Sequence, residues 1–309
     1  MSLGIVTRST RRGRPGAATT IDGRPMIQQQ GNVWYVDANV GGSGSGKSLQ
    51  SAFSTMEEAF DSLASGDTIY TRGKIREQLV TPVQVFDVSV IGLGNRPRHA
   101  DSTPDGGQEA ANTWAAPASP VAAQALVRVL QQGWLFENIL FAASAGCACI
   151  ELVRDAGSGN DERDASHVTI LRNRFAGVAS TDSAVKFGAT SYSEIVNNAR
   201  IEGNDFQGLA HAIKDNSANL SFRPQIVDNV FQANTNDVVL RAYQARILGN
   251  VMSLAPTAAL VLSGGVGSSQ VHGNYLPGTY ADGALYAPGT SDNWNGNYAS
   301  TGVTAAVPS

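Results

Sequence analysis

The sequence contains few charged, aromatic or cysteine residues. Charged residues make up 16% of its 309 positions and aromatic residues 7%, and there are two cysteines. No run of about 18 or more apolar residues is present, and the first residues lack the apolar stretch of a secretory signal, so we expect neither a membrane span nor export. The hydrophobic content of 42% is nevertheless sufficient for a large core in a chain of this length.

The two cysteines, Cys147 and Cys149, are separated by one residue, so on a strand both side chains would point to the same face. Neighbours on one face are poorly placed for a disulfide, and no histidine lies nearby at a spacing suited to a metal. We therefore expect buried free thiols, no bound metal or other cofactor, and synthesis in a reducing cytoplasm.

One short pattern recurs along the second half of the sequence: an aliphatic residue, two spacers, an asparagine, one spacer and a bulky apolar residue. Its copies are Leu135-Asn138-Leu140, Ile170-Asn173-Phe175, Ile201-Asn204-Phe206, Ile226-Asn229-Phe231, Ile247-Asn250-Met252 and Val271-Asn274-Leu276. A pattern that recurs every few tens of residues, each copy too short to bury its own apolar side, is typical of a solenoid. Asparagines at one place in successive coils can hydrogen-bond along the stack at a spacing of ~4.8 Å, so we interpret all six as structural.

A second short apolar run follows most copies of the pattern, as in the segments 184–187 and 238–240. We therefore predict two strands per repeat, separated by turns rich in Gly, Asn and Asp. Several charged residues fall on turns or outward faces, and the sequence identifies no matched pair of carboxylates among them. They are Asp182, Lys186, Asp205, Lys214, Asp215, Asp228, Asp237 and Arg241.

A single helix is predicted near residues 55–64. Ser54 and Glu57 have the spacing of a capping box, and Ser65-Gly66 supplies a glycine stop. The expected apolar face consists of Phe53, Met56, Ala59, Phe60 and Leu63.

The segment before this helix matches the phosphate-binding pattern Gly-x-x-x-x-Gly-Lys-Ser at Gly41, Gly46, Lys47 and Ser48. In a phosphate-binding loop the helix begins at the Lys-Ser pair, whereas here the helix signals begin only at Ser54. No alternation of strands and helices follows. We therefore predict no nucleotide site.

The segment from Tyr35-Val36-Asp37, through the glycine-serine loop and the short helix, to residues 65–70 resembles the start of right-handed parallel β-helix proteins of the pectate-lyase-like superfamily. In that superfamily the helix covers the open end of the coil stack. Together with the asparagine repeats, the resemblance implies an all-β fold: a right-handed, single-stranded parallel β-helix (solenoid) over residues 33–290 with one short N-terminal capping helix.

Two other segments are expected to lie outside the coils. Residues 94–120, dense in Pro, Gly, Asp and Ala, are predicted to form a long loop, and residues 291–309 a C-terminal tail. The phrases Asn95-Arg96-Pro97-Arg98 and Gly133-Trp-x-Phe-x-Asn138 resemble β-helix proteins encoded among bacteriophage structural genes. This resemblance implies a homotrimer, because such β-helices usually associate side by side.

Residues 1–32 are predicted to form a basic, flexible arm. The arm has one acidic residue, Asp22, and the rest of the chain carries 17 basic and 25 acidic residues. The basic residues of the arm are Arg8, Arg11, Arg12, Arg14 and Arg24. Such a segment is expected to become ordered only on a partner, for which an acidic protein surface is preferred. Nucleic acid is the weaker alternative because the acidic body would repel phosphates, and an unbound tail is a third interpretation.

The one acidic cluster consists of Asp155, Asp161, Glu162 and Asp164, in a glycine-rich excursion between strands. Such a loop could hold Ca²⁺ or contact a glycan, whereas the interspersed Arg154 and Arg163 favour a solvated turn. The lyase motifs of the superfamily are not recognisable in this sequence, so no catalytic residue is assigned.

Two hypotheses for function follow. The preferred one is a non-enzymatic bacteriophage virion protein that decorates the capsid or forms a short fibre or spike, made in the host cytoplasm and docked on other virion proteins through the arm. The alternative is a tailspike-like β-helix that binds or cleaves a host surface polysaccharide, as a lyase or a hydrolase. Neither hypothesis requires a membrane or a cofactor.

Overall fold

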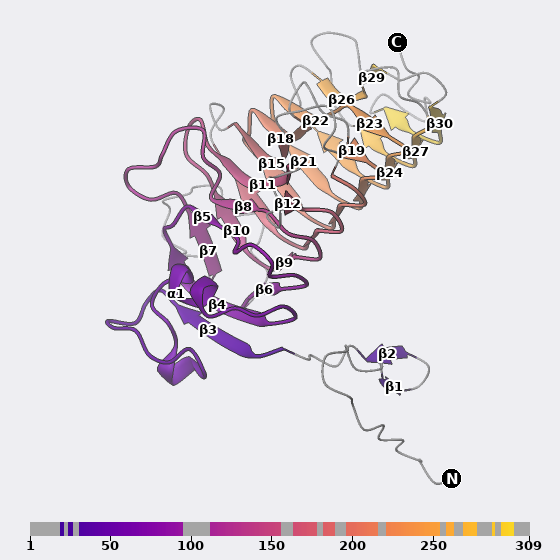
Figure 1. The fold of residues 1–309 in the computed structure, drawn as a ribbon. Coiled ribbons are helices and arrows are strands. Elements are labelled where there is room, and N and C mark those ends of the chain that lie inside the picture. Colours follow the sequence, from indigo (N-terminus) through magenta and orange to yellow (C-terminus); the bar gives the residue numbers. More distant parts are fainter. Residues whose placement is uncertain are drawn as a thin grey trace.

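The protein is a stack of parallel β-coils with α1 and β3 at its N-terminal end and β30 at the other (Figure 1). The structure is a computed structural model, and it describes residues 19–21, 24–26, 31–94, 112–155, 163–177, 182–188, 196–215, 221–253, 258–262, 268–276, 286–287 and 292–299. The stack confirms the predicted all-β parallel β-helix, with strands paired in parallel from coil to coil.

Three faces, called sheets 1, 2 and 3 below, make up the stack. Sheet 1 consists of β5 (Leu79–Val80), β8 (Val127–Val129), β11 (Ala148–Asp155), β15 (Ser183–Gly188), β18 (His211–Asp215), β22 (Asn236–Leu240), β26 (Ala258–Leu262) and β29 (Tyr286–Ala287). Sheet 2 consists of β3 (Val33–Asp37), β4 (Thr68–Ile75), β6 (Ser89–Gly92), β9 (Leu135–Glu137), β13 (Thr169–Leu171), β16 (Arg200–Glu202), β20 (Gln225–Val227), β24 (Arg246–Leu248), β27 (Gln270–His272) and β30 (Asn293–Asn295). Sheet 3 begins with the end of β4 and continues with β7 (Asn112–Ala115), β10 (Leu140–Ala142), β14 (Arg174–Ala176), β17 (Asp205–Gln207), β21 (Val230–Gln232), β25 (Val251–Ser253), β28 (Tyr275–Leu276) and β31 (Tyr298–Ala299).

Smaller pairings lie beside these sheets. β1 (Thr19–Ile21) pairs antiparallel with β2 (Arg24–Met26), and β12 (Arg163–Asp164) pairs antiparallel with the end of β11. β19 (Ser221–Phe222) and β23 (Ala242–Tyr243) are parallel and form part of the corner between sheets 1 and 2. The prediction of two strands per repeat was wrong, because the chain bends at the asparagine and divides the first apolar run into a sheet 2 strand and a sheet 3 strand.

A ladder of six buried asparagines follows this bend: Asn173, Asn204, Asn229, Asn250, Asn274 and Asn297. At each step the backbone N–H of one asparagine donates to the Oδ1 atom of the asparagine in the next coil, over 2.8 to 3.0 Å. The side-chain amide also donates to a carbonyl of the preceding coil, as Asn229 does to Ile201. The ladder confirms the structural interpretation of five of the six predicted asparagines.

Asn138 is not part of the ladder. Strand pairing places Phe136 beside Ile170, so the ladder position in this coil falls to Ile139, whose N–H donates to Oδ1 of Asn173 over 2.9 Å. Asn138 instead has a left-handed backbone with φ of 59°, and its side chain donates to carbonyls of the coil before it. The sequence pattern had aligned Leu135 with Ile170, one residue out of register, and it had omitted Asn297.

Two predicted boundaries also need correction. β30 and β31 pair with β27 and β28, so the coils continue to residue 299 and residues 292–299 are not part of a tail. Within the predicted loop 94–120, residues 112–115 form β7, whose Trp114 is fully buried and stacks on Phe141. Residues 95–111 lie outside the described residues.

The helix α1 (Met56–Asp61) covers the N-terminal end of the core. It buries Met56, Ala59 and Phe60, and the Phe60 ring packs edge-on against Trp134 at a centroid distance of 5.6 Å. Its capping box is formed by Thr55 and Glu58, one residue later than predicted, because Thr55 is the last residue with extended backbone. The short 3₁₀-helix Leu49–Ser51 precedes it.

Stacked aromatic rings fill the middle of the core. Phe141, Phe175, Phe206 and Phe231 occupy matched positions in four successive coils, with centroid distances of 4.8 to 5.1 Å between neighbours. Cys147 and Cys149 are both buried free thiols, as predicted, and burial raises the pKa of Cys149 to about 12. Among the described residues, no helix has the length and apolar character needed to cross a membrane.

Candidate functional site

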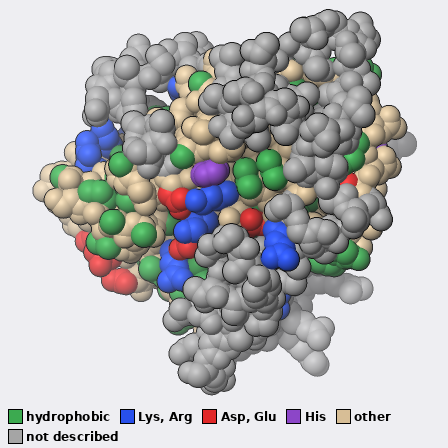
Figure 2. Space-filling view, turned by 90° about the horizontal axis from the view of Figure 1, so that it is seen from above, with side chains coloured by type: hydrophobic (Ala, Val, Ile, Leu, Met, Phe, Trp, Pro, Cys, Tyr) green, Lys and Arg blue, Asp and Glu red, His purple; other side chains and the backbone are tan. Residues whose placement is uncertain are grey.

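The outward face of sheet 1 carries a cluster of charged side chains, called the charged column here (Figure 2). Four of its members occupy the same register position in four successive strands, and Asp182 lies just before β15. The four are Arg128, Glu151, Lys186 and Lys214. Side chains at one register position of a parallel sheet lie ~4.8 Å apart, so oppositely charged neighbours can pair directly.

The charges in this column alternate and pair across the coils. Glu151 lies 3.2 Å from Arg128 and 3.8 Å from Lys186, measured between carboxylate oxygens and cationic nitrogens. Asp182 lies 3.4 Å from Lys186 and also forms a short ion pair with Lys214. Lys186 therefore bridges two carboxylates, and a continuous set of ion pairs runs from β8 to β18.

The ionisation of Asp182 reflects these neighbours. Burial raises its pKa, but hydrogen bonds and charges from Lys214 and Lys186 outweigh burial, so the pKa of Asp182 lies below its usual value. The carboxylate is accordingly ionised near neutral pH, and its negative charge is matched by two ammonium groups.

Two further titratable groups lie on β18. Burial raises the pKa of Asp215 to about 7, although the backbone N–H of Arg241 donates to its carboxylate. Burial and the charge of Lys214 lower the pKa of His211, partly opposed by Asp182. Among the described residues, His211 Nδ1 has no hydrogen-bond partner. Asp215 can thus carry a proton near neutral pH, which is the property of a general acid.

The predicted acidic cluster is only partly described. Asp161 and Glu162 lie outside the described residues, and Asp155 ends β11 opposite Arg163. Asp164 accepts hydrogen bonds from the N–H and hydroxyl of Ser166, and Arg154 lies 4.0 Å from it. Asp164 thus supports a local turn, and the glycan or Ca²⁺ site stays a prediction. Among the residues described, no group of three or more His, Cys, Asp or Glu has the geometry of a metal site.

The arginines of the arm cannot be placed. Arg8, Arg11, Arg12 and Arg14 lie outside the described residues, and Arg24 is known only as a backbone position in β2. Their role in partner binding stays a prediction.

The segment that resembles a phosphate-binding loop has another use for its residues. Lys47 lies over the indole of Trp34, with Nζ 3.3 Å from the ring centroid, and Ser48 caps the 3₁₀-helix. The α-helix begins only at Met56, so its first amides do not face the Gly46-Lys47 segment.

The sequence had named Asp182, Lys186 and Lys214 as outward-facing residues without grouping them. A signal for the grouping does exist, because a charged residue follows a buried aliphatic residue in β8, β11, β15 and β18, as in Val185-Lys186 and Ile213-Lys214. The interval from the preceding asparagine differs between these coils, which hides the shared register.

Comparison with known proteins reveals similarity of structure without similarity of sequence. No family model matches the chain, and no curated protein matches it. A solved structure of the pectate lyase Pel9A is 13% identical, covers 90% of this chain and 78% of its own, and superposes with a TM-score of 0.50.

Two other solved structures are more distant. XylC in complex with xylose is 12% identical, with 80% of this chain and 69% of its own covered and a TM-score of 0.47. ORF18 of Geobacillus virus E2 is 11% identical, with 90% and 67% covered and a TM-score of 0.42. At such identities similarity establishes architecture and not activity. The chain has a right-handed parallel β-helix fold, similar to that of the pectate lyase Pel9A.

Proposed function

We propose that this chain is a non-enzymatic structural protein of a bacteriophage particle, a stiff β-helix that decorates the capsid or forms a short fibre or spike. The charged column is the observation that carries the proposal. Its lysines and carboxylates are bound to one another, and they join four coils. Side chains that a lyase or hydrolase would direct at substrate thus serve to hold the stack together.

The interior supports a role as a rigid module. The asparagine ladder satisfies buried polar groups in successive coils, and the phenylalanine stack fills the space between the sheets. Such a stack resists bending because each coil contacts its neighbours along all three sheets. The link to a phage particle rests on the sequence phrases at residues 95–98 and 133–138.

Attachment belongs to the same proposal. The arm supplies five arginines for an acidic surface on another virion protein, and a homotrimer would bring three arms to one site. An exposed apolar column on sheet 3 offers a contact between copies. It consists of the exposed Val230, Tyr275 and Tyr298 and the half-buried Val251, at matched register in four coils.

A second candidate function is cleavage of a host polysaccharide. Two titratable groups on β18 favour it: Asp215, with a pKa of about 7, and His211, whose Nδ1 is unpartnered among the described residues. A carboxylic acid that is partly protonated at neutral pH could donate a proton to a glycosidic oxygen.

One pair of experiments separates these functions. The full-length protein is incubated with capsular and lipopolysaccharide glycans of the host, and new reducing ends and unsaturated sugars are measured. We expect neither product. Products that disappear in both Asp215→Asn and Lys214→Gln variants would establish cleavage instead.

Attachment is tested with a full-length variant in which Arg8, Arg11, Arg12, Arg14 and Arg24 are changed to Ser. We expect the variant to keep the β-rich circular dichroism of the native protein and to lose co-sedimentation with particles that lack the native protein. Normal incorporation of this variant would show that the arm is not the anchor.

A further inference from the structure

The first strand of sheet 1 has one uncovered side. The N–H groups of Leu79 and Thr81 donate to carbonyls of Leu126 and Arg128 and so join β5 to β8. Because successive peptide groups along a strand point to opposite sides, the N–H and carbonyl of Val80 point away from β8. Among the residues that the structure describes, neither group of Val80 has a hydrogen-bond partner. One edge of sheet 1 therefore offers unpaired backbone groups to another strand.

The same edge of sheet 2 is closed. The N–H of Tyr35 in β3 donates to the carbonyl of Gly46, and the N–H of Phe53 donates to the carbonyl of Tyr35, over 2.8 Å in both cases. The segment 46–53 thus covers β3 in the way that a further strand would. Proteins cover such edges because an open edge accepts strands from other chains. Of these two edges, only that of β5 is open.

Apolar side chains lie at the open edge. Val80 and Val83 are 43% and 44% exposed, although both are hydrophobic. Val80 lies on the outward face of sheet 1, at the register position of Arg128 and the rest of the charged column. Exposed valines beside an unpaired strand favour contact with another apolar segment.

The helix beside this edge is acidic. Glu77, two residues before β5, accepts hydrogen bonds from the N–H groups of Met56 and Glu57 at the start of α1, both over 2.9 Å. Burial and the charges of Glu57 and Glu58 raise the pKa of Glu77. Glu57 and Asp61 are exposed, and neither forms an ion pair with a described residue. The edge surface, as we call it below, consists of β5, Val80, Val83, Glu57 and Asp61.

The arm begins at the same end of the stack as β5. Gly31 packs so closely on the residue after α1 that a Cβ there would lie 2.2 Å from the carbonyl oxygen of Gly66. In the arm, β1 and β2 pair with each other and with no other described strand. The two residues between them, Asp22-Gly23, are a pair typical of hairpin turns. Because two strands alone are only marginally stable in water, this hairpin would gain from a third strand.

We propose that the hairpin of one copy adds to the edge surface of a second copy. The N–H and carbonyl of Val80 pair with the backbone of the hairpin, as in other cases of strand addition to an open sheet edge. Apolar residues in and beside the hairpin suit the two exposed valines: Ile21, Met26 and Ile27. The arm also carries five arginines and one acidic residue, so its charge is opposite to that of Glu57 and Asp61.

The length of the arm favours a neighbouring copy. Residues 27–30 connect β2 to Gly31 and span at most about 14 Å, whereas α1 alone is about 9 Å long and separates Gly31 from Glu77. The hairpin therefore reaches an edge surface only on a copy that is already in contact, as the apolar column on sheet 3 would allow. Because the arm and β5 lie at one end of the stack, the exchange needs no shift along it, and copies related by rotation can close a ring.

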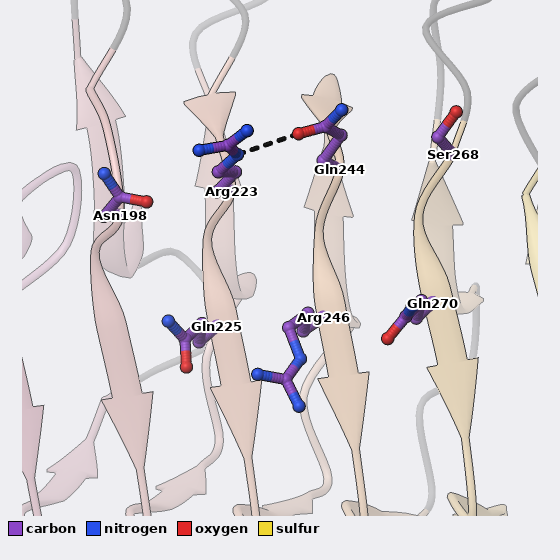
Figure 3. A pocket seen from close by; sticks show the side chains of 7 residues that line it. All are labelled: Asn198, Arg223, Gln225, Gln244, Arg246, Ser268 and Gln270. Atoms are coloured by element: carbon purple, nitrogen blue, oxygen red, sulfur yellow. Dashed lines mark hydrogen bonds between the residues drawn. The ribbon is translucent and has the colours of Figure 1, made fainter.

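A polar groove on the outer face of sheet 2 suits the hairpin less well. It has a volume of about 380 Å³, and its strands are paired on both sides, so it presents side chains and no open edge (Figure 3). Arg223 and Arg246 are exposed there, and they would repel the arginines of the arm. The lining residues are Asn198, Arg223, Gln225, Gln244, Arg246, Ser268 and Gln270.

Docking of the hairpin rests on the attachment role that we propose for the arm, and it adds a second copy of the chain to the partners of the arm. The test uses cross-linking of the purified full-length protein. Two variants, Gln28→Cys in the arm and Val83→Cys beside β5, are mixed and treated with a short bismaleimide. We expect covalent dimers that contain one chain of each variant. Gln270→Cys, at an exposed position in the groove, replaces Val83→Cys as the control and should give several-fold less product. The native thiols are buried and should not react.

Changes at Val80 test the backbone pairing. Proline is tolerated on an edge strand where the missing N–H faces outward, so Val80→Pro should keep the thermal unfolding midpoint of the native protein. It should lower the yield of cross-linked dimer by about tenfold, because a backbone donor is lost and an acceptor stays unpaired. Val80→Ser keeps the N–H and should retain most of the product. Ile21→Pro in the arm should give the same loss as Val80→Pro without altering the stack.

Charge is tested separately. Changing both Glu57 and Asp61 to Gln should lower the yield at low ionic strength, and added salt should remove the difference from the native edge surface. Equal yields at low salt would show that the acidic helix plays no part.

Several outcomes would overturn the docking of the hairpin. These are equal product with Val83→Cys and Gln270→Cys, equal product with Val80→Pro and Val80→Ser, and full product with Ile21→Pro. Cross-links confined to single chains, when Gln28→Cys and Val83→Cys are combined in one chain, would assign the hairpin to its own β5. Because no particles are used, such results would leave the co-sedimentation test of attachment unaffected.

Discussion

Asn229 donates twice to the same oxygen of Asn250: its backbone N–H lies 2.9 Å and its side-chain nitrogen 3.0 Å from Asn250 Oδ1. Asn229 Oδ1 in turn accepts from both nitrogens of Asn204. Both asparagine side chains are fully buried. Because water cannot replace a lost partner there, each amide is held by its neighbours and constrains the bend of the coil on either side.

Replacement of Asn229 by Leu should therefore destabilise the stack strongly. It removes the acceptor for Asn204 and the donor to Ile201, leaving buried polar groups unpaired at about 1–3 kcal/mol each. We expect a lower midpoint of thermal unfolding by circular dichroism. Asn295→Leu is the matched control, since Asn295 is exposed at the end of β30. Equal midpoints for the two variants would show that the ladder does not stabilise the fold.

Gly92, at the end of β6, should not tolerate any side chain. A Cβ atom there would lie 2.1 Å from the carbonyl oxygen of Asn138 and 2.7 Å from the side-chain nitrogen of Asn112. Because the first contact is with backbone of the next coil, Gly92→Ala should cost about 1–3 kcal/mol in the free energy of unfolding.

The control for this change is Gly41→Ala, because a Cβ at Gly41 would meet no atom within 4 Å. Gly41 also belongs to the segment that matches the phosphate-binding pattern. Full stability of the Gly41→Ala variant would show that this position has no requirement for glycine. Urea unfolding measures both. A Gly92→Ala protein as stable as the native one would show that β6 and the next coil can move apart.

The sequence was sufficient for the architecture but not for its register. The recurring asparagine and the helix near residue 56 predicted a capped coil stack, because both signals are local and repeat at each coil. The alignment failed at Asn138, where isoleucine occupies the ladder position and asparagine the left-handed one. Only strand pairing distinguishes these two positions, since both lie in the same bend.

The candidate sites were less predictable because they consist of residues from different coils. Lys186 and Lys214 are neighbours because β15 pairs with β18. In the sequence, loops of unequal length separate the paired strands, so the shared register cannot be read from spacing alone. The pairing of Arg246 with Gln225 and Gln270 has the same origin. Arg200 and Arg246 are both exposed arginines on sheet 2, and composition alone does not distinguish them. Arg200 forms an ion pair with Glu202 of its own strand, whereas β24 contains no acidic residue beside Arg246.

The apolar column on sheet 3 gives a prediction about assembly. Tyr275 is 45% exposed, Tyr298 44% and Val230 37%, so three of the large hydrophobic side chains exposed in the described residues share one face. If copies associate there, changing both tyrosines to Ser should convert a trimer to monomers, as measured by light scattering. Val121→Ser, at an exposed position before β8, is the control and should leave the assembly intact. A native protein that is monomeric at high concentration would contradict the prediction.

The raised pKa of Asp215 should be detectable in the pH dependence of the free energy of unfolding. Its folded pKa of about 7 lies above the usual 3.8, so the folded state binds the proton more tightly than the unfolded state does. This contribution to stability is complete at low pH and is lost as the pH rises through about 7. Asp215→Asn keeps an acceptor for the N–H of Arg241 and removes the titration, so the variant should gain stability over the native protein as the pH rises.

The expected gain is on the order of a few kcal/mol, because each pKa unit of difference corresponds to about 1.4 kcal/mol. Burial also raises the pKa of Asp237, so the Asp237→Asn change should act in the same direction.

Asp182 is the opposite case. Lys214 and Lys186 lower the pKa of its carboxyl, so the stability that Asp182 contributes is present at neutral pH and is lost on acidification. Thermal unfolding between about pH 4 and 8 measures the Asn variants of all three residues. Parallel curves for Asp215→Asn and the native protein would show that Asp215 has an ordinary pKa and cannot serve as the general acid of a glycan-cleaving site.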